Sequence, residues 1–362
     1  MDKILAINPG NTSTKVGIFE DNKLLNQKSI RHDKKDLDVF PNILDQLKFR
    51  SKAIGSFLRD NNIKTSGIDH FIGRGGLLKP LRSGLYMVNQ EMISDLKSEK
   101  YGEHSSNLGA LIAQRIATKY GKKAYILDPV CVDELEPIAR ITGHPKIHKV
   151  SAFHALNQKS VARRASAELG KRYGDINLII AHLGSGISVG LHRKGKIVDV
   201  NNAIAGEGPF SPERSGGIPA GTYLKYAYDN KLDFHDSLKM LYGQGGMYAY
   251  LGTNDFQEVM EDYDKGNNEN LKLVIDAMAY KISKAISALA APVSGEVDGI
   301  VITGGLAYSK TFTSIIKSSI RFLTDNIFIY PGEDELQAMA DGVVLGLKGE
   351  IEIHEYASEK DL

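Results

Sequence analysis

Residues 4–20 read Ile4-Leu-Ala-Ile-Asn-Pro-Gly-Asn-Thr-Ser-Thr-Lys-Val-Gly-Ile-Phe-Glu20, and this stretch decides the fold. The apolar run Ile4–Ile7 ends in a loop of Gly and small polar residues, and a second run covers Lys15–Glu20. A turn at Asp21-Asn22 then leads into a third run, Leu24–Ile30. Short apolar runs bounded by turn residues are typical of strands. The N-terminus is therefore predicted to form three consecutive strands.

The same pattern occurs again about 170 residues later. Leu178–Ala181 is followed by the loop His182-Leu-Gly-Ser-Gly186, by Ile187–His192 and, after a turn at Lys194-Gly195, by Ile197–Val200. Val16-Gly17-Ile18 aligns with Val189-Gly190-Leu191. We interpret the two copies as an internal duplication, although meanders are common enough for two of them to agree by chance.

Helical stretches lie between and after the copies, and a strand follows each of them. Apolar residues recur with helical spacing in three segments: Gly102–Lys119, Ala155–Leu169 and Asn270–Ala291. The strands that follow are Ala124–Leu127, Leu178–Ala181 and Gly299–Thr303. This alternation predicts an α/β architecture.

The length of 362 residues predicts two domains. We expect residues 1–150 to form the first domain and residues 151–334 the second. A C-terminal helix within residues 335–362, starting at Glu335, is expected to pack back on the first domain.

Composition excludes several classes of protein. Lys and Arg number 45 against 44 Asp and Glu, so the net charge of +1 provides no general attraction for nucleic acid or an anionic membrane. The single Cys131 excludes an internal disulfide and a zinc site of several thiolates, and it fits a reducing compartment. We see no export signal and no apolar run of the ~20 residues that span a bilayer. The protein is therefore expected to be cytoplasmic.

Three loops that follow predicted strands are rich in Gly and small polar residues: Asn8–Lys15, His182–Gly186 and Thr303–Ala307. Backbone amides that no side chain covers can converge on an anion, and hydroxyls and a Lys add donors. A hairpin glycine is the simpler explanation of any one loop, but three together favour a phosphate site. The spacings of a P-loop, of a dinucleotide fold and of a protein kinase catalytic loop are absent.

Nine segments of the chain resemble motifs of the acetate and butyrate kinase family, in order and from end to end. They are Asn8-Pro-Gly-Asn-Thr-Ser-Thr-Lys15, Gly73-Arg-Gly-Gly76, Gly102-Glu-His-Ser-Ser-Asn107, Phe153-His-Ala-Leu-Asn-Gln158, Ala181-His-Leu-Gly-Ser-Gly186, Glu207-Gly-Pro-Phe-Ser-Pro-Glu-Arg-Ser-Gly216, Gly252-Thr-Asn-Asp255, Thr303-Gly-Gly-Leu-Ala-Tyr308 and Tyr330-Pro-Gly-Glu-Asp-Glu335. The resemblance implies two duplicated actin-like (ribonuclease-H-like) domains, with mixed sheets flanked by helices and a nucleotide cleft between them. It also implies ATP/ADP and Mg²⁺ as cofactors and a homodimer or higher homo-oligomer.

The activity implied is reversible, ATP-dependent phosphorylation of butyrate to butyryl phosphate. Phosphorylation of isobutyrate, acetate or propionate stays an alternative within the class. Outside the class, the same fold could belong to a non-catalytic nucleotide-binding protein related to actin or to chaperones. A carboxylate is ionised at neutral pH and is already a nucleophile, so alignment and positive charge should matter more than a general base.

The resemblance assigns catalytic roles to Arg74, Asp128, His154 and Arg214. Arg74 would bind the acyl carboxylate or the phosphoryl oxygens, since its forked donors suit either. His154 would donate to the phosphoryl oxygens in the transition state, and Asp128 would lie near the substrate and Mg²⁺. From the sequence alone, Asp128 could equally be a turn residue before Pro129, and both arginines could be surface charges.

The family's nucleotide site maps onto the three loops and one further acid. The residues expected there are Asn8, Asn11, Ser13, Lys15, His182, Gly184, Ser185, Gly186, Asp255, Gly304, Gly305 and Ala307. Asn11 and Ser185 stand where acetate kinases usually carry Ser and Asn. The expected metal residues are Glu335 and Asn8, although Glu333 or Asp334 could take the role of Glu335.

Four residues are expected in the substrate pocket: Gly75, Gly76, His104 and Phe153. Acetate kinases tend to have branched apolar residues after the arginine, where this chain has Gly75 and Gly76. We hypothesise that the missing side chains widen the acyl pocket for a four-carbon chain.

Overall fold

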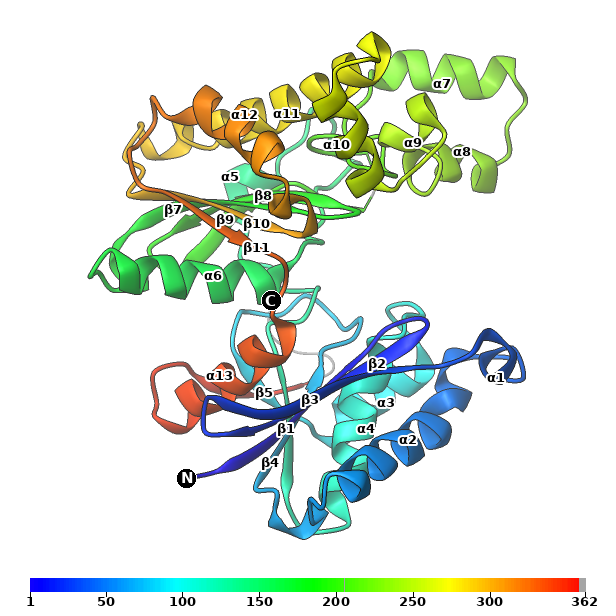
Figure 1. Ribbon diagram of the computed structural model, residues 1–362, viewed down its shortest axis with the longest axis vertical. Coiled ribbons are helices and arrows are strands. Elements are labelled where there is room, and N and C mark those ends of the chain that lie inside the picture. The colour runs from blue at the N-terminus through cyan, green and yellow to red at the C-terminus, as the bar shows by residue number, and fades with distance from the viewer. Residues whose placement is uncertain (205, 358–362) are drawn as a thin grey trace. The chain divides into compact units, whose positions relative to one another are not determined.

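The structure is a computed structural model that describes residues 1–204 and 206–357. The chain folds into two compact units (Figure 1). Unit 1 comprises Met1–Asp133 and the chain from Asp334 onward, and unit 2 comprises Glu134–Glu333. Each unit contains one sheet. No helix in the described part of the chain is long and apolar enough to cross a membrane.

The division falls earlier in the chain than the expected boundary at residue 150. The segment after Glu134 is fastened to the sheet of unit 2, because the Glu134 carboxylate accepts from Lys159 Nζ at 2.7 Å and from the Ile197 amide at 2.9 Å. The amide of Glu136 donates to the Val198 carbonyl. Charge pairs and strand contacts of this kind leave no composition signal that a sequence could reveal.

Unit 1 is built on a seven-stranded sheet in the order β12-β5-β6-β4-β1-β2-β3. Its elements are β1 (Lys3–Pro9), β2 (Ser13–Glu20), β3 (Lys23–Arg31), α1 (Lys34–Leu37), α2 (Leu47–Asp60), β4 (His70–Arg74), β5 (Leu85–Met87), α3 (Gln90–Ser98), α4 (Asn107–Thr118), β6 (Lys123–Leu127), α13 (Glu335–Leu347) and β12 (Ile353–Glu355), with short 3₁₀ turns at Ile43–Gln46 and Thr65–Gly67. Strands β1, β4 and β6 are parallel, and β1, β2 and β3 are antiparallel. Helix α13 packs against β1.

The backbones of β4 and α4 approach each other more closely than side chains would allow. A Cβ atom at Gly73 would overlap the carbonyl of Gly109, and one at Gly109 would overlap the carbonyl of Arg74. Glycine at both positions permits this approach. The contact fixes the end of β4, where Arg74 stands.

Unit 2 is built on a five-stranded sheet in the order β11-β10-β7-β8-β9. Its elements are α5 (Pro137–Arg140), α6 (Ala155–Glu168), β7 (Asn177–Leu183), β8 (Ile187–Arg193), β9 (Lys196–Val200), α7 (Ala220–Asp229), α8 (Phe234–Leu241), α9 (Gly246–Leu251), α10 (Phe256–Lys265), α11 (Glu269–Ala288), β10 (Gly299–Gly304), α12 (Lys310–Ile320) and β11 (Ile327–Pro331), with 3₁₀ turns at Tyr173–Asp175, Ala291–Val293 and Gly305–Tyr308.

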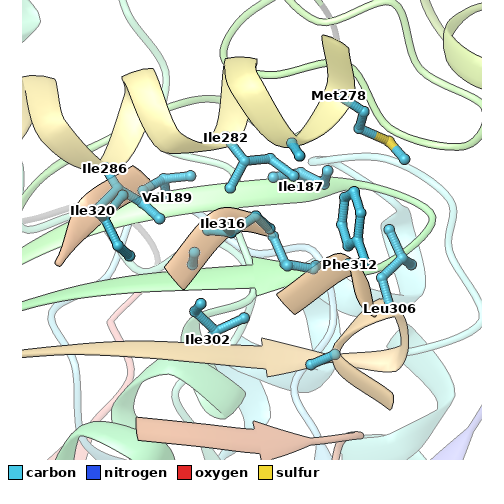
Figure 2. Close-up of a cluster of buried hydrophobic side chains, with 14 of the residues drawn as sticks. Ile187, Val189, Met278, Ile282, Ile286, Ile302, Leu306, Phe312, Ile316 and Ile320 are labelled. Atoms are coloured by element: carbon cyan, nitrogen blue, oxygen red, sulfur yellow. The ribbon is translucent and has the colours of Figure 1, made fainter. Parts of the chain in front are cut away.

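The two faces of the unit 2 sheet carry different helices. Side chains from α11 and α12, among them Ile282 and Ile316, pack on one face against Val189 and Ile302 (Figure 2). Helix α6 covers the other face, where its residues pack against Ile180. Because successive residues of a strand point to opposite faces, both faces of β7 are apolar and buried.

The duplication predicted from the sequence is present in the topology. The order β4-β1-β2-β3 in unit 1 is matched by β10-β7-β8-β9 in unit 2, and the strand directions agree pair by pair. The register shifts at Ile18/Phe19 in the first copy and at Leu191/His192 in the second. These positions are equivalent in the alignment of Gly17 with Gly190. A shared irregularity at one position argues against chance agreement.

One predicted helix begins later than expected. Helix α4 starts at Asn107 rather than Gly102, because Gly102 has a φ of +118° and the Asn107 side chain accepts from the amide of Leu77. Residues 102–106 lie outside the helix and include His104. The predicted helix Asn270–Ala291 is observed as α11, three residues shorter at its C-terminal end.

Candidate active site

The loop Asn8–Lys15, which the sequence predicts to bind phosphate, connects β1 to β2 and is held by Arg50 of α2. The Arg50 guanidinium donates to the carbonyls of Gly10 at 2.8 Å, Ser13 at 2.9 Å and Asn11 at 2.9 Å. It also donates to Thr14 Oγ1 and to Gln46 Oε1. All of these acceptors are neutral, and no motif in the sequence predicts a role for Arg50.

Arg50 brings a buried positive charge to the loop. Its side chain is 1% exposed, and burial lowers its pKa to about 10, so it stays charged at neutral pH. Within residues 1–204 and 206–357, no carboxylate contacts the guanidinium. A cation that is not neutralised by a partner attracts an anion placed on the loop above it.

Two polar side chains of the loop, those of Asn8 and Lys15, lie on one face of the hairpin. Asn8 lies directly opposite Lys15 in the antiparallel ladder, so the two side chains share a face. Lys15 and Asn11 are exposed, and Ser13 is half-buried. The loop closes on itself, because the amide of Gly10 donates to the Ser13 carbonyl at 2.8 Å.

The carboxylate of Glu335 joins Asn8 to Arg74. Glu335 Oε1 accepts from Arg74 Nη1, and Oε2 accepts from Asn8 Nδ2. Glu335 is the first residue of α13, where the helix dipole favours an acid. The three side chains come from β1, β4 and α13.

The three consecutive acids Glu333, Asp334 and Glu335, any of which the sequence allowed as the metal ligand, have different contacts in the structure. Asp334 caps α13, since its carboxylate accepts from the Gln337 amide. Glu333 lies 3.0 Å from His182 Nε2 in unit 2. Glu335 contacts Asn8 and Arg74. Among the described residues, no group of three or more His, Cys, Asp or Glu side chains could by itself hold a metal ion.

His104 stands near Arg74. The amide of Ser106 donates to His104 Nδ1 at 3.2 Å, so Nδ1 is the acceptor and Nε2 carries the proton in the neutral ring. Partial desolvation lowers the pKa of His104, and the positive charge of Arg74 lowers it further. His104 is therefore neutral at pH 7 and presents an N–H donor.

Asp128 is buried at the end of β6 with a φ of +37°. Its Oδ1 accepts from Ser83 Oγ at 2.6 Å and from the Gly84 amide at 2.8 Å. These bonds fix the connection into β5. The carboxylate therefore has a structural role, in line with the alternative that Asp128 is a turn residue before Pro129.

Gly75 and Gly76 have a packing role, and the hypothesis of a widened acyl pocket needs correction. A Cβ at Gly75 would lie 2.6 Å from Pro129 Cβ. A Cβ at Gly76 would lie 2.5 Å from Asn107 Oδ1 and 2.8 Å from Leu96 Cδ2. The space next to each glycine is already filled by protein atoms, so the missing side chains leave no room for an acyl chain there.

In unit 2, the loop His182–Gly186 is fastened to the segment that carries Arg214. Ser211 Oγ donates to the Ser185 carbonyl, and it accepts from the Arg214 amide at 3.1 Å. The Arg214 guanidinium donates to the carbonyl of Ala203 and occupies the place that a Cβ at Gly186 would take. Burial lowers the pKa of Arg214. Three predicted residues, Ser185, Gly186 and Arg214, are thus brought together.

His154 and His182 stack on each other, with ring centroids 3.7 Å apart and planes 10° apart. His182 is fully buried, and its Nδ1 lies 2.8 Å from Asn157 Oδ1. His154 immediately precedes α6, and its Nδ1 lies 2.9 Å from Ser188 Oγ. The two histidines, which lie 28 positions apart in the sequence, form one pair in space.

The other residues predicted for the nucleotide and substrate sites of unit 2 lie at separate positions. Gly304 has a φ of +90°, and its Cβ would overlap the backbone of Leu183, whereas a Cβ at Gly305 would meet nothing within 4 Å. Ala307 and Phe153 are each 2% exposed. Asp255 caps α10 by accepting from the amides of Gln257 and Glu258. Open space at Gly305 is compatible with a ligand, while Asp255 has a sufficient structural role.

The chain is similar to two relatives over almost its whole length. It is 46% identical to butyrate kinase 2 of Clostridium acetobutylicum, over 98% of this chain and 99% of that protein. It is 44% identical to butyrate kinase 1 of the same organism, over 98% of this chain and 100% of that protein. The chain belongs to the acetokinase family. The profile of that family matches residues 146–322.

Solved structures confirm the acetokinase fold. An acetate kinase from Porphyromonas gingivalis superposes with a TM-score of 0.77 at 19% identity, covering 95% of this chain and 100% of that one. A propionate kinase from Francisella tularensis superposes with a TM-score of 0.75 at 18% identity, covering 94% and 99%. The expected α/β class, with mixed sheets flanked by helices in an actin-like fold, is therefore correct.

Proposed function

We propose that the protein catalyses the reversible transfer of the γ-phosphoryl group of ATP to the carboxylate of butyrate, giving butyryl phosphate and ADP. The observation that carries this proposal is the 44–46% identity to two butyrate kinases over 98% of the chain. In the forward step, a carboxylate oxygen attacks the γ-phosphorus while the bond from that phosphorus to the bridging oxygen of ADP breaks. No proton has to be removed, because the acid is ionised at neutral pH.

The side chains in each unit suit a reaction that needs positive charge and hydrogen-bond donors. Unit 1 supplies Arg74, the neutral donor His104 and the buried cation Arg50. Unit 2 supplies Arg214 and the pair of His154 and His182. We assign Arg74, Arg214 and His154 to the transferring phosphoryl group and the acyl carboxylate, with Asp128 supporting them from the end of β6. The idea that both units act on one bound nucleotide stays a prediction.

We assign the nucleotide to the three loops named from the sequence. Asn8, Asn11, Ser13 and Lys15 would hold phosphate oxygens over Arg50. In unit 2 the proposed contacts are His182, Gly184, Ser185 and Gly186, with the backbone at Gly304, Gly305 and Ala307 beneath the adenosine. His104 and Phe153 stay assigned to the substrate side.

The donor set of unit 1 fits Mg²⁺, which prefers a carboxylate together with phosphate oxygens and water to a cage of protein ligands. Glu335 offers the carboxylate and Asn8 an amide oxygen. Bound there, Mg²⁺ would neutralise charge on the transferring phosphoryl group. Glu335 would give up one of its contacts with Asn8 or Arg74 in order to bind it.

The proposal is tested by trapping acyl phosphate with hydroxylamine in a panel of straight and branched C2 to C5 acids, with ATP and with or without Mg²⁺. We expect the highest kcat/KM for butyrate. A preference for isobutyrate, acetate or propionate would reassign the substrate, and no acyl hydroxamate with any acid would overturn the activity. Arg74→Ala and Arg214→Ala should each lower kcat by roughly 10²-fold or more.

We also propose a cytoplasmic homo-oligomer. Several large apolar side chains on α7, α8 and α9 are exposed, including Leu224, Tyr228, Phe234 and Tyr250. Apolar surface gathered on neighbouring elements is typical of subunit interfaces. Light scattering after gel filtration should give at least twice the chain mass of 39.7 kDa.

A further inference from the structure

A chain of five buried or half-buried polar side chains runs through unit 2 and ends at His154. Tyr173 Oη lies 2.7 Å from His192 Nδ1, and His192 Nε2 lies 3.0 Å from Gln158 Oε1. Gln158 Nε2 lies 2.9 Å from Ser188 Oγ, which lies 2.9 Å from His154 Nδ1. Gln158, Ser188 and His192 are each fully buried. Buried polar groups of this kind act as one network, so a proton position at one end constrains the other.

The orientation of the Gln158 amide fixes which groups donate and which accept in this network of hydrogen bonds. Gln158 Nε2 also lies 3.2 Å from the carbonyl oxygen of Ser188, which can only accept. The NH₂ group therefore faces Ser188, and Oε1 faces His192. Gly190 leaves room for this oxygen, because a Cβ there would lie 2.6 Å from Gln158 Oε1.

The protons on either side follow from that orientation. His192 Nε2 faces an acceptor and must carry a proton. Burial, followed by the charges of Lys159 and Arg163, holds the pKa of His192 well below its usual value, so the ring is neutral. Its Nδ1 then accepts from the Tyr173 hydroxyl.

Ser188 connects the Gln158 amide to His154, so the orientation of the amide also decides how the Ser188 hydroxyl bonds to His154. The Ser188 oxygen already accepts from the Gln158 NH₂ group, so its own hydrogen must point at an acceptor. Among the described residues, Ser188 Oγ contacts Gln158 Nε2, which can only donate, and His154 Nδ1. The hydroxyl therefore donates to Nδ1.

We infer that Ser188 and Gln158 are positioning residues that hold neutral His154 in the tautomer with the proton on Nε2. This inference deepens the proposed function, on which it rests, because the Nε2–H group is the donor that a phosphoryl oxygen needs. A ring with its proton on Nδ1 would present a lone pair at Nε2 and repel that oxygen. The role is analogous to that of partners that orient a metal-binding or catalytic imidazole.

The test combines NMR with kinetics. The protein is labelled with ¹⁵N-histidine, and His154→Gln identifies the His154 signals in spectra that correlate ring nitrogens with ring protons. In the unaltered protein we expect a protonated Nε2 and an unprotonated Nδ1 at pH 7.5. Ser188→Ala should populate both tautomers and lower kcat roughly tenfold, with the KM values for ATP and butyrate within about twofold. Gln158→Met, of similar length, should have the same effect through Ser188.

Ser188→Thr keeps the hydroxyl and should restore the Nε2 tautomer and most of kcat. A protonated Nδ1 in the unaltered protein, or an unchanged tautomer in Ser188→Ala, would overturn the inference. Failure of the proposed function would look different. The protein would make no acyl phosphate, but it would still show the Nε2 tautomer, and Ser188→Ala would still lose that tautomer. The hydrogen-bond order would then stand, and only its role in catalysis would be lost.

Discussion

The guanidinium of Arg74 is paired with the carboxylate of Glu335, although 261 positions separate the two residues in the chain. Each side chain is only 15% exposed. The second carboxylate oxygen of Glu335 is bound by Asn8. The Glu335 carboxylate thus holds a side chain from β1 and a side chain from β4. Replacing Glu335 tests both the ion pair and the proposed metal ligand.

We expect Glu335→Gln to lower kcat by roughly 10²-fold and to raise the Mg²⁺ concentration needed for half-maximal rate. Glutamine has nearly the same shape but carries no charge, so Arg74 loses its partner and Mg²⁺ loses an anionic ligand. The measurement is acyl hydroxamate formation during a Mg²⁺ titration. Asp334→Ala is the matched control: loss of the α13 cap should cost about 1 kcal/mol of stability and leave the Mg²⁺ dependence unchanged. An equal shift in both variants would count against Glu335 as the ligand.

Replacing Arg50 should weaken nucleotide binding, although we expect no direct contact with ATP. Arg50→Met removes the charge and leaves the carbonyls of Gly10, Asn11 and Ser13 without a donor, whereas Arg50→Lys keeps the charge but not the fork. We expect the Kd for ATP to rise at least tenfold in Arg50→Met and less in Arg50→Lys, measured by titration calorimetry.

The control for Arg50 lies on the same helix. Arg59 is exposed, and it donates to Ser56. Arg59→Met should leave the Kd unchanged. Binding by Arg50→Met equal to that of the unaltered protein would show that the loop needs neither the charge nor the fork.

The sequence was sufficient for features that depend on local pattern. Runs of apolar residues beside turns located β1, β2 and β3 and their copies in unit 2, because strand periodicity and turn chemistry are local. The family resemblance implied that Arg214 is catalytic and that Ser185 binds the nucleotide, and both residues contact Ser211 in the structure. Arg50 could not be found this way, because an arginine on an amphipathic helix ordinarily faces solvent. Its burial depends on the carbonyls of a loop 40 positions away.

The same limit explains the error at Gly76. A glycine after an active-site arginine suggests open space when only the chain itself is known. Whether that space is empty depends on α4, which brings Asn107 and Leu96 against it. Close backbone approach, as between Gly73 and Gly109, leaves no signal beyond the glycines themselves.

Gly76→Ala should therefore destabilise the protein rather than change its choice of acid. The new Cβ would lie 2.5 Å from Asn107 Oδ1, so α4 would have to move, at a cost of about 1–3 kcal/mol. Because the chain contains no Trp, urea unfolding is followed by circular dichroism. At Gly67, where a Cβ meets nothing within 4 Å, the same substitution should have little effect. A changed ratio of kcat/KM for butyrate and acetate with normal stability would restore the acyl-pocket hypothesis.

Acid should destabilise the protein in part through His32. This ring is 7% exposed, and its Nε2 lies 2.8 Å from Thr14 Oγ1, which accepts from Arg50. Burial lowers the pKa of His32, and the charge of Arg50 lowers it further. As the pH falls below about 6.5, the unfolded chain binds a proton that the folded protein resists. The free energy of unfolding should then fall by up to about 1.4 kcal/mol per pH unit from this one group, until the folded pKa is reached.

His32→Gln keeps a hydrogen-bonding side chain but cannot titrate, so it should flatten the dependence of unfolding free energy on pH between 7 and 5. Urea unfolding at half-unit intervals measures this slope. A residual slope is expected in the variant, because burial also lowers the pKa of His70, His104 and His192. His235→Gln, at an exposed position on α8, controls for the loss of a histidine as such. If the slope of His32→Gln matched that of the unaltered protein, the proton excluded on folding would have to be assigned to the other buried rings.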